Sequence, residues 1–598
     1  MFEDLHGRRL MLTDVIYQKE SKITGWHDYI NMVYRDLLTG EKHLYTIRDP
    51  KYIIYEVKEE FRTFRKARHY LPVEQCEPIE ICYKDRFKAI AEIAGGEYKQ
   101  KLYNAKTNAE KKELYKYPYV LGADIPIETY YRVQWDKELG NEDKKVPTVI
   151  YLDIEVDQLG WDGGGIARHG ECPIDAISVV DPTSMTVSQF LYHTKDNPQI
   201  DDFIQNRQPE VQQRFHEMFD ESYGVFDYRI YMFEDELEMI QQCFRLIHTL
   251  KRDFCLIWNG MGFDIPYLME RIYALGAKAE DVMCHSDFPT TTMYLFEDTT
   301  AYDFDKKRDY FDISSYTHYL DQMIMYASLR KSQGALRRVN LNSIGKAELG
   351  DTKLDYTDVG NFLRFSREDY IRYVLYNVKD TLLQYGIDNK CHDSLSYYNS
   401  CYSSFCSYKD GLKQTVSLRA FFYYEFMEDG YILGHNVNFG GKGKVETPKA
   451  TEALSEEEDG WDFGDDDDDD SFEGAINGDP ELNSETGLEL FGRRSKYLYG
   501  ACMDFDFSAM YPNSIVAWNI FAETMIGKLY IHNGDNLKTY DVDAGKEYVE
   551  DIITENNLFT GHKWFQLPDF NKLNEIIAEE LKLDPVGIEP YPQEKIPW

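Results

Sequence analysis

The stretch Thr148–Val156 narrows the possible folds of this chain more than any other. Its apolar density and β-branched side chains predict a buried strand, and strand alternation puts Asp153 and Glu155 on one face. Two carboxylates this close repel each other, and burying them without a cation costs free energy. A divalent metal ion would resolve that conflict. The alternative is an edge strand whose two acids face solvent.

A second informative stretch begins about 100 residues later in the chain. Residues Phe254–Trp258 predict a strand, and Asn259–Gly262 predict a loop. Phe263 and Asp264 then lead into a helix that is expected to begin near Ile265–Leu268. The sequence therefore predicts a strand, a loop and a helix in direct succession, with Asp264 at the last boundary.

A third stretch predicts a long helix. The segment Ser366–Asp369 is typical of a capping box, and the helix is expected to run to Tyr385 with Gly386 at its end. Tyr376 and Asp380 are four residues apart, so they lie on the same face of that helix. Taken alone, this pair is a weak signal, because a helical Tyr usually packs half-buried.

Together, the ordered set D-x-E, N-x-x-x-F-D and Y-x-x-x-D resembles the three exonuclease motifs of the proofreading domain in family B DNA polymerases. The resemblance implies an α/β domain with a ribonuclease-H-like fold over residues 146–390. It implies two divalent ions, Mg²⁺ or Mn²⁺, held by four acids: Asp153, Glu155, Asp264 and Asp380. It also implies that Tyr376 orients the attacking water and that Asn259 and Phe263 contact the 3′-terminal nucleotide.

Phosphodiester chemistry supports this assignment independently of the resemblance. In-line hydrolysis needs an activated water on one side and neutralisation of the leaving 3′-oxygen on the other. Two metal ions about 4 Å apart, held by carboxylates, supply both. The DNA end must be single-stranded to enter such a cleft, and stacking on aromatic side chains is expected to help hold it.

Another carboxylate-bearing strand is predicted near the end of the sequence. Within Ala501–Ile515, apolar residues alternate with Asp504 and Asp506, and Ser508 and Pro512 mark a turn into a helix. Asp506 and the residues up to Pro512 resemble motif A of family B polymerases, with a continuation like that of T-even-phage-like members. The resemblance implies that Asp506 binds a metal ion of the polymerase palm. It also implies a nucleotide-binding segment made by Phe507, Ser508, Ala509, Met510 and Tyr511.

Nucleotidyl transfer by two metal ions needs at least one more carboxylate and cations for the triphosphate. The family supplies these in K-x-x-x-N-S-x-Y-G and D-T-D-S, and neither occurs here. We therefore expect the N-terminal subunit of a split viral DNA polymerase, completed by a second chain with motifs B and C, fingers and thumb. The alternatives are a non-catalytic DNA-binding or scaffold subunit of a replication complex, and a truncated chain with exonuclease activity only.

The net charge of −39 is unfavourable for a nucleic-acid binder, which needs Lys and Arg to neutralise phosphates. Much of it is local, since Glu452–Glu489 holds 17 acidic residues and no basic one, which leaves −22 for the rest. Basic stretches remain at Arg62–Tyr70 and Arg493–Lys496. The run Asp465–Asp470 cannot pack and predicts a disordered insertion or a solvated loop.

Neither a signal peptide nor an apolar run of about 18 residues is found, so export and membrane insertion are disfavoured. The ten cysteines are scattered without a C-x-x-C pair, which favours a reduced protein with free thiols in the cytoplasm, that of the host cell if the chain is viral. The expected partners are DNA as primer-template or single-stranded 3′ end, dNTP, the second polymerase chain and replisome proteins.

The expected organisation is that of a multidomain α/β (α+β) protein. It comprises an N-terminal domain (1–145), the exonuclease domain (146–390), a connecting helical segment (391–450), an acidic disordered insertion (451–471) and a partial palm with motif A (472–598). In the first of these, Lys51–Val57 predict a strand and Ala105–Tyr115 a helix. In the connecting segment, Leu418–Met427 predict a helix with a large buried aromatic surface.

Overall fold

The computed structural model of the chain describes residues 2–433 with short gaps, and two strands beyond them. The gaps are residues 23, 63–69, 141–145, 159–167, 195–196, 300, 302, 332–338 and 360–361. By its internal contacts the chain divides into two units, Met1–Asp466 and Asp467–Trp598. In the second unit, the description covers the antiparallel pair β17 (Gly527–His532) and β18 (Asp584–Pro590). The acidic segment 451–471 and motif A with Asp506 lie outside the described residues.

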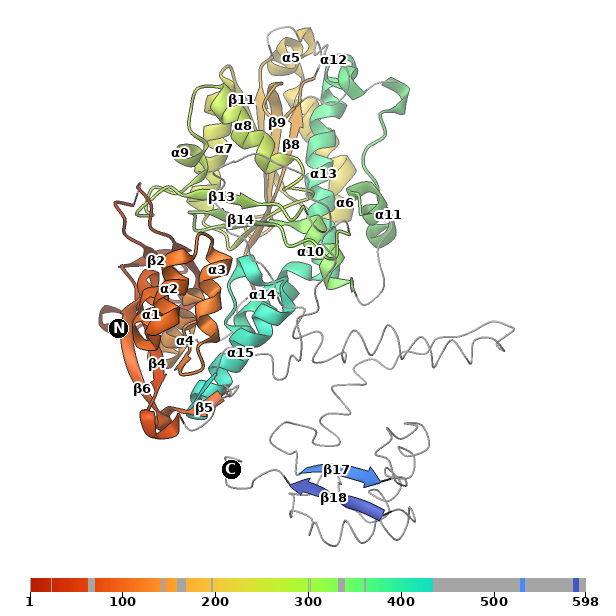
Figure 1. Ribbon diagram of the computed structural model, residues 1–598. Helices are drawn as coiled ribbons and strands as arrows, with labels where there is room; N and C mark the ends of the chain where they lie inside the picture. The colour runs from red at the N-terminus through yellow and green to blue at the C-terminus, as the bar shows by residue number, and fades with distance from the viewer. Residues whose placement is uncertain are drawn as a thin grey trace, which may run out of the picture. The chain divides into compact units, whose positions relative to one another are not determined.

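Small antiparallel sheets begin the chain (Figure 1). The first joins β1 (Leu10–Gln18), β2 (Tyr29–Asp36) and β3 (Lys42–Arg48) in sequence order. The second places β4 (Lys51–Val57) between β6 (Cys76–Cys82) and β7 (Val120–Leu121), so the strand predicted for 51–57 is confirmed.

Four helices accompany these sheets: α1 (Arg86–Ala94), α2 (Gly96–Asn104), α3 (Asn108–Lys112) and α4 (Ile127–Leu139). The single helix expected over 105–115 is wrong in extent. Thr107 accepts a hydrogen bond from the backbone of Glu110 in a capping box, which delays the start of α3, and a 3₁₀ turn follows at Glu113–Lys116. Trp135 of α4 is fully buried in the core of this region.

The central sheet has six strands in the order β11-β10-β9-β8-β12-β15. They are β8 (Val149–Val156), β9 (Ile174–Asp181), β10 (Thr186–Tyr192), β11 (Asp227–Phe233), β12 (Phe254–Ile257) and β15 (His318–Asp321). Only β9 runs antiparallel to β8; the other strands run parallel to it. A mixed sheet with its first strand in the middle and its second antiparallel is the ribonuclease-H-like arrangement, so the α/β prediction is confirmed.

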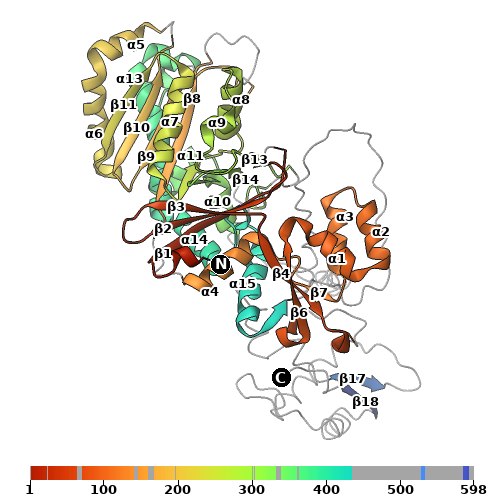
Figure 2. The ribbon, with the colours of Figure 1, turned by 90° about the vertical axis from the view of Figure 1, so that its left-hand side faces the viewer.

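Helices cover both faces of this sheet (Figures 1 and 2). Val149 and Tyr151 of β8 pack in a core with α6 (Gln208–Tyr223) and the long helix α13 (Tyr370–Cys391). Ile150, Leu152 and Ile154 pack in a second core with α7 (Glu236–Leu250) and α8 (Asp264–Ala274). Because side chains alternate, Asp153 and Glu155 continue the row of Val149 and Tyr151 and face α13.

Shorter elements complete this region. They are α5 (Pro198–Asp202), α9 (Ala279–Met283), the hairpin β13 (Met293–Phe296) and β14 (Tyr310–Ile313), α10 (Gln322–Leu329), α11 (Leu341–Leu349) and α12 (Phe365–Glu368). Among the helices of the described ranges, none combines the length and the apolar character needed to cross a bilayer. The nine cysteines in those ranges all carry free thiols.

Helix α13 differs at both ends from the sequence-based expectation. Ser366 and Glu368 belong to α12, and the N-cap is Asp369, whose side chain accepts a hydrogen bond from the backbone of Arg372. At the other end the helix continues through Gly386 to Cys391. A Cβ at Gly386 would lie 2.8 Å from Leu349 and 2.9 Å from Tyr223. This glycine therefore permits close packing and does not end the helix.

Two helices follow, α14 (Asp393–Ser404) and α15 (Gln414–Glu428), and β16 (Tyr431–Leu433) then pairs with β5 (Tyr70–Pro72). The predicted helix over 418–427 is confirmed, but its buried aromatic surface is only partly so. Tyr423 is buried, whereas Phe421 and Phe422 are 37% and 39% exposed.

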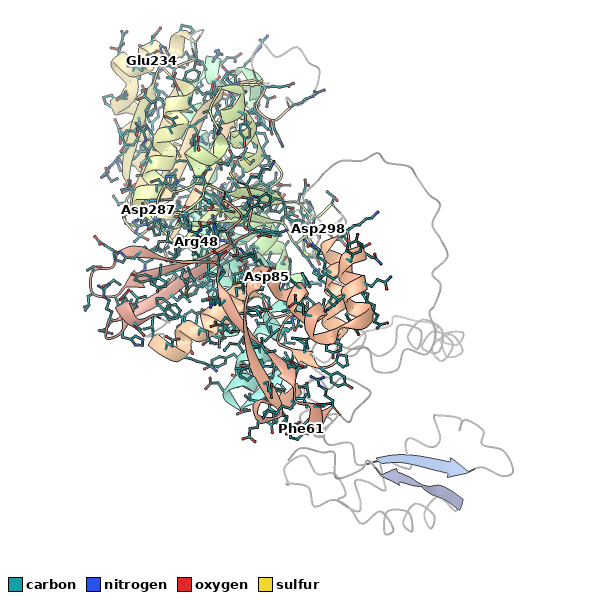
Figure 3. The ribbon with its side chains drawn as sticks, turned by 60° about the vertical axis from the view of Figure 1, so that its left-hand side comes forward. Arg48, Phe61, Asp85, Glu234, Asp287 and Asp298 are labelled. Atoms are coloured by element: carbon teal, nitrogen blue, oxygen red, sulfur yellow. The ribbon has the colours of Figure 1, made fainter. Side chains whose placement is uncertain are left out.

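A buried cluster of charges joins the first sheet to the central sheet. Asp253, just before β12, lies 2.9 Å from Arg35 Nη2 of β2 and 2.8 Å from Lys42 Nζ of β3. Val33 packs against Phe288 and Tyr316 at the same junction, and the hydroxyl of Tyr316 donates to Asp287, which Figure 3 labels. Burial alone would raise the pKa of Asp253, but the two cations and the backbone N–H of Thr148 hold it at about 2.

We predict that Asp253→Asn destabilises the protein by about 3 to 5 kcal/mol at neutral pH, because it leaves Lys42 buried without its countercharge. The pKa of Asp253 is depressed in the folded state. Its contribution is therefore full above the ordinary Asp pKa of about 4 and is lost as the pH falls through about 2. Chemical denaturation at several pH values measures this.

The control is Glu80→Gln, which breaks the exposed ion pair with Lys51. It should change the unfolding free energy little, because water screens such pairs. Equal effects of the two substitutions would contradict the assigned role of Asp253.

Candidate active site

Three acidic side chains converge where β8 meets α13. Asp153 and Glu155 come from β8, and Asp380 comes from α13. Each offers a carboxylate oxygen, and these oxygens all lie within 4.8 Å of one another. Glu155 and Asp380 are buried, while Asp153 is partly exposed. The structure thus brings together three of the four predicted metal ligands.

This arrangement is electrostatically unfavourable without a cation. Burial is the largest cause of the raised pKa of all three acids, and Asp380 raises the pKa of Asp153 further. The buried Oδ1 of Asp380 has no hydrogen-bond partner. A divalent cation would neutralise the charges and satisfy this oxygen, so the carboxylates fit a metal ion.

Lys353 contributes a positive charge beside these acids, and the sequence analysis missed it. Its Nζ lies 2.5 Å from Asp380 Oδ2 and 3.3 Å from the hydroxyl of Tyr376. Burial opposes its charge, yet Asp380, Tyr376 and Asp153 raise the pKa of Lys353. Lys353 lies in an irregular segment before α12, and nothing in its local sequence indicated a place in the site.

Tyr376 lies on α13 beside Asp380, as predicted, and is buried. Its ring packs among Tyr356, Phe362 and Phe365. Burial first, and then the charge of Asp380, raise the pKa of Tyr376, so its hydroxyl stays protonated at neutral pH. It can therefore donate a hydrogen bond but is a poor general base.

Asp264 lies next to this group but outside its tight core. It is the first residue of α8, is 3% exposed, and its Oδ1 accepts a 3.3 Å hydrogen bond from the backbone of Ile154. Burial and the charge of Asp153 raise its pKa. Its role as a metal ligand stays a prediction.

Asn259 and Phe263 flank the loop between β12 and α8, as predicted. Asn259 has a positive φ of 61°, and its amide lies so close to Gly262 that a Cβ there would meet Oδ1 at 2.5 Å. Phe263 is half-buried, and its ring centroid lies 5.3 Å from that of Tyr267. Gly262 thus leaves room for the amide of Asn259. DNA contact by Asn259 or Phe263 stays a prediction.

A second residue that the sequence analysis missed is Asn377, which follows Tyr376 on α13. Its Nδ2 lies 3.0 Å from Oδ2 of Asp153 and 3.3 Å from the backbone oxygen of that residue. Its spacing of three from Asp380 and four from Tyr373 places it on the inner face of the helix. That spacing could have signalled its position.

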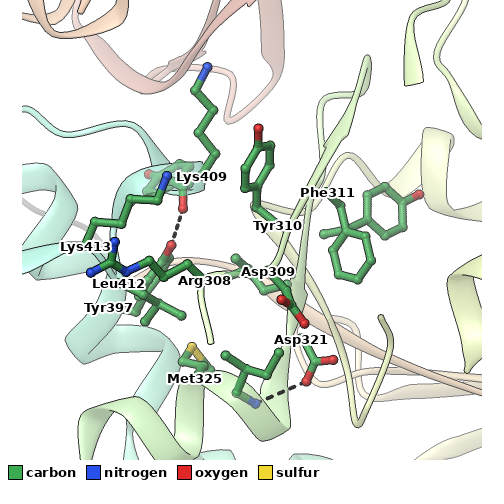
Figure 4. Close-up of a pocket in the computed structure, with 14 residues that line it drawn as sticks. Arg308, Asp309, Tyr310, Phe311, Asp321, Met325, Tyr397, Lys409, Leu412 and Lys413 are labelled. Atoms are coloured by element: carbon green, nitrogen blue, oxygen red, sulfur yellow. Dashed lines mark hydrogen bonds between the residues drawn. The ribbon is translucent and has the colours of Figure 1, made fainter. Parts of the chain in front are cut away.

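A hollow elsewhere in the molecule does not belong to this site (Figure 4). It lies between the β14–β15 region and the segment after α14, and is lined by residues that include Asp309, Asp321, Lys409 and Lys413. Asp321 caps α10 by accepting hydrogen bonds from Met323 and Ile324, so its carboxylate is already used. None of the three clustered carboxylates lines this hollow.

Comparison with known proteins gives a consistent result. Residues 127–331 match the family model described as DNA polymerase family B, exonuclease domain. The DNA polymerases of Bombyx mori and Autographa californica nuclear polyhedrosis viruses are each 26% identical over 177 residues, and that of Orgyia pseudotsugata multicapsid polyhedrosis virus is 22% identical over 175. These matches cover 29% of this chain and 17% of each relative.

We predict that Asp153→Asn stabilises the metal-free protein at neutral pH, on the order of 1 kcal/mol, because it removes an acid whose ionised form is disfavoured by burial and by the charge of Asp380. The folded-state pKa of Asp153 is raised, so the metal-free wild type should lose stability as the pH rises above the ordinary Asp value of about 4. Thermal unfolding in EDTA measures both effects.

Asp227→Asn is the control, since this acid pairs with Arg229 and is 60% exposed. It should change the metal-free midpoint little. A lower midpoint for Asp153→Asn than for this control would contradict the electrostatic account.

Proposed function

We propose that the chain acts as a metal-dependent 3′–5′ proofreading exonuclease on DNA, in keeping with the match of residues 127–331 to the exonuclease domain of family B DNA polymerases. The observation that carries this proposal is the set of three acids from β8 and α13 whose carboxylate oxygens lie within 4.8 Å of one another. Such a set fits divalent metal ions and phosphodiester hydrolysis.

Asp153, Glu155 and Asp380 would hold the metal, with Asp264 beside them as a further candidate ligand. When bound, Mg²⁺ or Mn²⁺ supplies an activated water and neutralises charge on the leaving 3′-oxygen. The protonated hydroxyl of Tyr376 donates a hydrogen bond that orients the water. Lys353 holds that hydroxyl and Asp380 in place, through contacts of 3.3 and 2.5 Å.

We further propose that Asn259 and Phe263 receive the 3′-terminal nucleotide. They lie on the loop directly before Asp264, and this loop follows β12, the strand that pairs with β8. A half-buried aromatic ring gives an unstacked base a surface to pack on. The amide of Asn259 would give the sugar or phosphate a polar partner.

The polymerase part of the hypothesis stays a prediction from sequence motifs. Asp506, the nucleotide-binding segment 507–511 and the dNTP that it would bind fall outside the described residues. A second chain with motifs B and C, and replisome partners, belong to the same prediction. The viral relatives are named DNA polymerases, which agrees with a role in DNA replication.

We predict that the full chain with Mg²⁺ shortens 5′-labelled single-stranded DNA stepwise from its 3′ end. Asp153→Ala with Glu155→Ala should reduce the rate at least about 100-fold, because losing ligands costs more than losing a group that only hydrogen-bonds a ligand. The readout is the product ladder on a denaturing gel. Asp227→Asn is the control and should cleave like the wild type, and persistent cleavage by the double variant would refute the site.

Lys353→Met should lower the turnover number about 10- to 100-fold, since Asp380 and Tyr376 lose the group that holds them. Steady-state kinetics on the same substrate measure this. The matched control is Lys390→Met, which removes an exposed lysine of α13 that pairs with Glu348. If both variants cleave at equal rates, Lys353 has no part in the reaction.

A further inference from the structure

A chain of buried amide and hydroxyl groups leads from β11 to the carboxylate of Asp153. Tyr228 lies on β11, Gln189 on β10 and Asn377 on α13, and their exposures are 4%, 0% and 0%. All three lie between the sheet and α13, on the face that carries Asp153 and Glu155. Buried polar groups need hydrogen-bond partners, so each of these three side chains is expected to be held by defined donors and acceptors.

The orientation of Gln189 is fixed by a backbone carbonyl. Its Nε2 lies 2.8 Å from the oxygen of Val374 in α13. A carbonyl can only accept, so the amino group of Gln189 must face α13. Its Oε1 consequently faces β11, where the hydroxyl of Tyr228 donates to it at 2.5 Å.

The orientation of Asn377 follows from that of Gln189. The amino group of Gln189 also lies 3.2 Å from Asn377 Oδ1 and donates to it. The amino group of Asn377 is then left to face β8. There it donates to two groups that accept, Oδ2 of Asp153 at 3.0 Å and the backbone oxygen of Asp153 at 3.3 Å. The backbone carbonyls of Val374 and Asp153 thus exclude a flipped amide at Gln189 and at Asn377.

The hydrogen bond from Asn377 to Asp153 has an ionised acceptor when a metal ion is bound. It therefore fixes the carboxylate more firmly than a hydrogen bond between neutral groups would. It engages Oδ2 alone, so Oδ1 of Asp153 stays free of this donor. We propose that Asn377, held in one orientation by Gln189, is a positioning residue that fixes the Asp153 carboxylate for divalent-cation binding. The purpose of this positioning rests on the proposed nuclease function. Its measurement does not, because cation binding can be followed without DNA.

The test uses the full chain without DNA and measures how Mn²⁺ raises the thermal unfolding midpoint. Asn377→Leu should raise the Mn²⁺ concentration for half-maximal stabilisation about 10-fold, the usual cost of losing a hydrogen bond to a metal ligand. Asn377→Ser keeps a polar group that is too short to reach Asp153, so it should raise this Mn²⁺ concentration as well. Because serine is small and polar, this variant replaces the leucine variant if that one does not fold.

Gln384→Leu is the matched control. Gln384 is a buried amide on the same helix, and its Nε2 donates to β8 at the backbone oxygen of Leu152, 3.3 Å away, not to a carboxylate. For this variant, the Mn²⁺ concentration for half-maximal stabilisation (the Mn²⁺ midpoint) should stay within about twofold of the wild-type value, because the residue touches no metal ligand. Equal Mn²⁺ midpoints in the Asn377 variants and the control would overturn the proposal.

Two more variants test the orientation itself. Gln189→Leu removes the donor to Asn377 Oδ1. It should therefore raise the Mn²⁺ concentration for half-maximal stabilisation as Asn377→Leu does, although residue 189 touches no carboxylate of the site. Tyr228→Phe should leave the midpoint close to wild type, because Val374 still orients Gln189. If Gln189→Leu needs no more Mn²⁺ than the wild type, the role of Gln189 is overturned.

Nuclease assays of the same proteins separate this proposal from the function on which it rests. Wild-type protein that binds Mn²⁺ but leaves DNA intact would refute the nuclease while the Asn377 comparison still decides the positioning role. In active protein, Asn377→Leu at limiting Mn²⁺ should lower the turnover number and leave KM for DNA unchanged. A wild-type chain with no Mn²⁺-dependent shift would overturn the proposal together with the metal site.

Discussion

Repulsion among the buried acids at the junction of β8 and α13 is the constraint on which the site depends. Asp153, Glu155 and Asp380 lie together where water is scarce, and their pKa values are raised as a result. The contact of Lys353 with Asp380 answers this repulsion only in part. The fold holds the acids together because the surrounding cores on both faces of the sheet stabilise β8 and α13 independently of the site. A bound divalent cation would neutralise the charge that Lys353 leaves uncompensated.

The polar groups around the acids are as ordered as the apolar core. Ser178 contacts Thr381, Gln384 reaches the backbone of Leu152, and Asn377 reaches Asp153, so α13 is fixed along β8 and β9 by buried hydrogen bonds. Apolar packing alone would let a helix slide or rotate on a sheet. Specific donors and acceptors remove that freedom, and they set the carboxylates of the two elements at a defined distance.

The sequence predicted the features that depend on alternation and spacing over a few residues. They are the α/β class, the strands around 51–57 and 149–156, and the acids of β8. The ends of α13 could not be predicted in this way. The segment Ser366–Asp369 was expected to open the helix as a capping box, but Asp369 is itself the N-cap. Gly386 permits the close approach of Leu349 and Tyr223, which come from distant parts of the chain. The exposure of Phe421 and Phe422 likewise depends on which face of α15 meets its neighbours.

The sequence by itself determined which acids share a face: Asp153 with Glu155 on a strand, and Tyr376 with Asp380 on a helix. Its ordered motifs also indicated the kind of chemistry. Only the tertiary structure decided that β8 and α13 meet with these faces together, that Asp264 stands beside the tight group and not within it, and that Lys353 and Asn377 complete the surroundings. The physical reason is distance along the chain: Asp153 and Asn377 are 224 residues apart, and no local pattern records a contact across that separation.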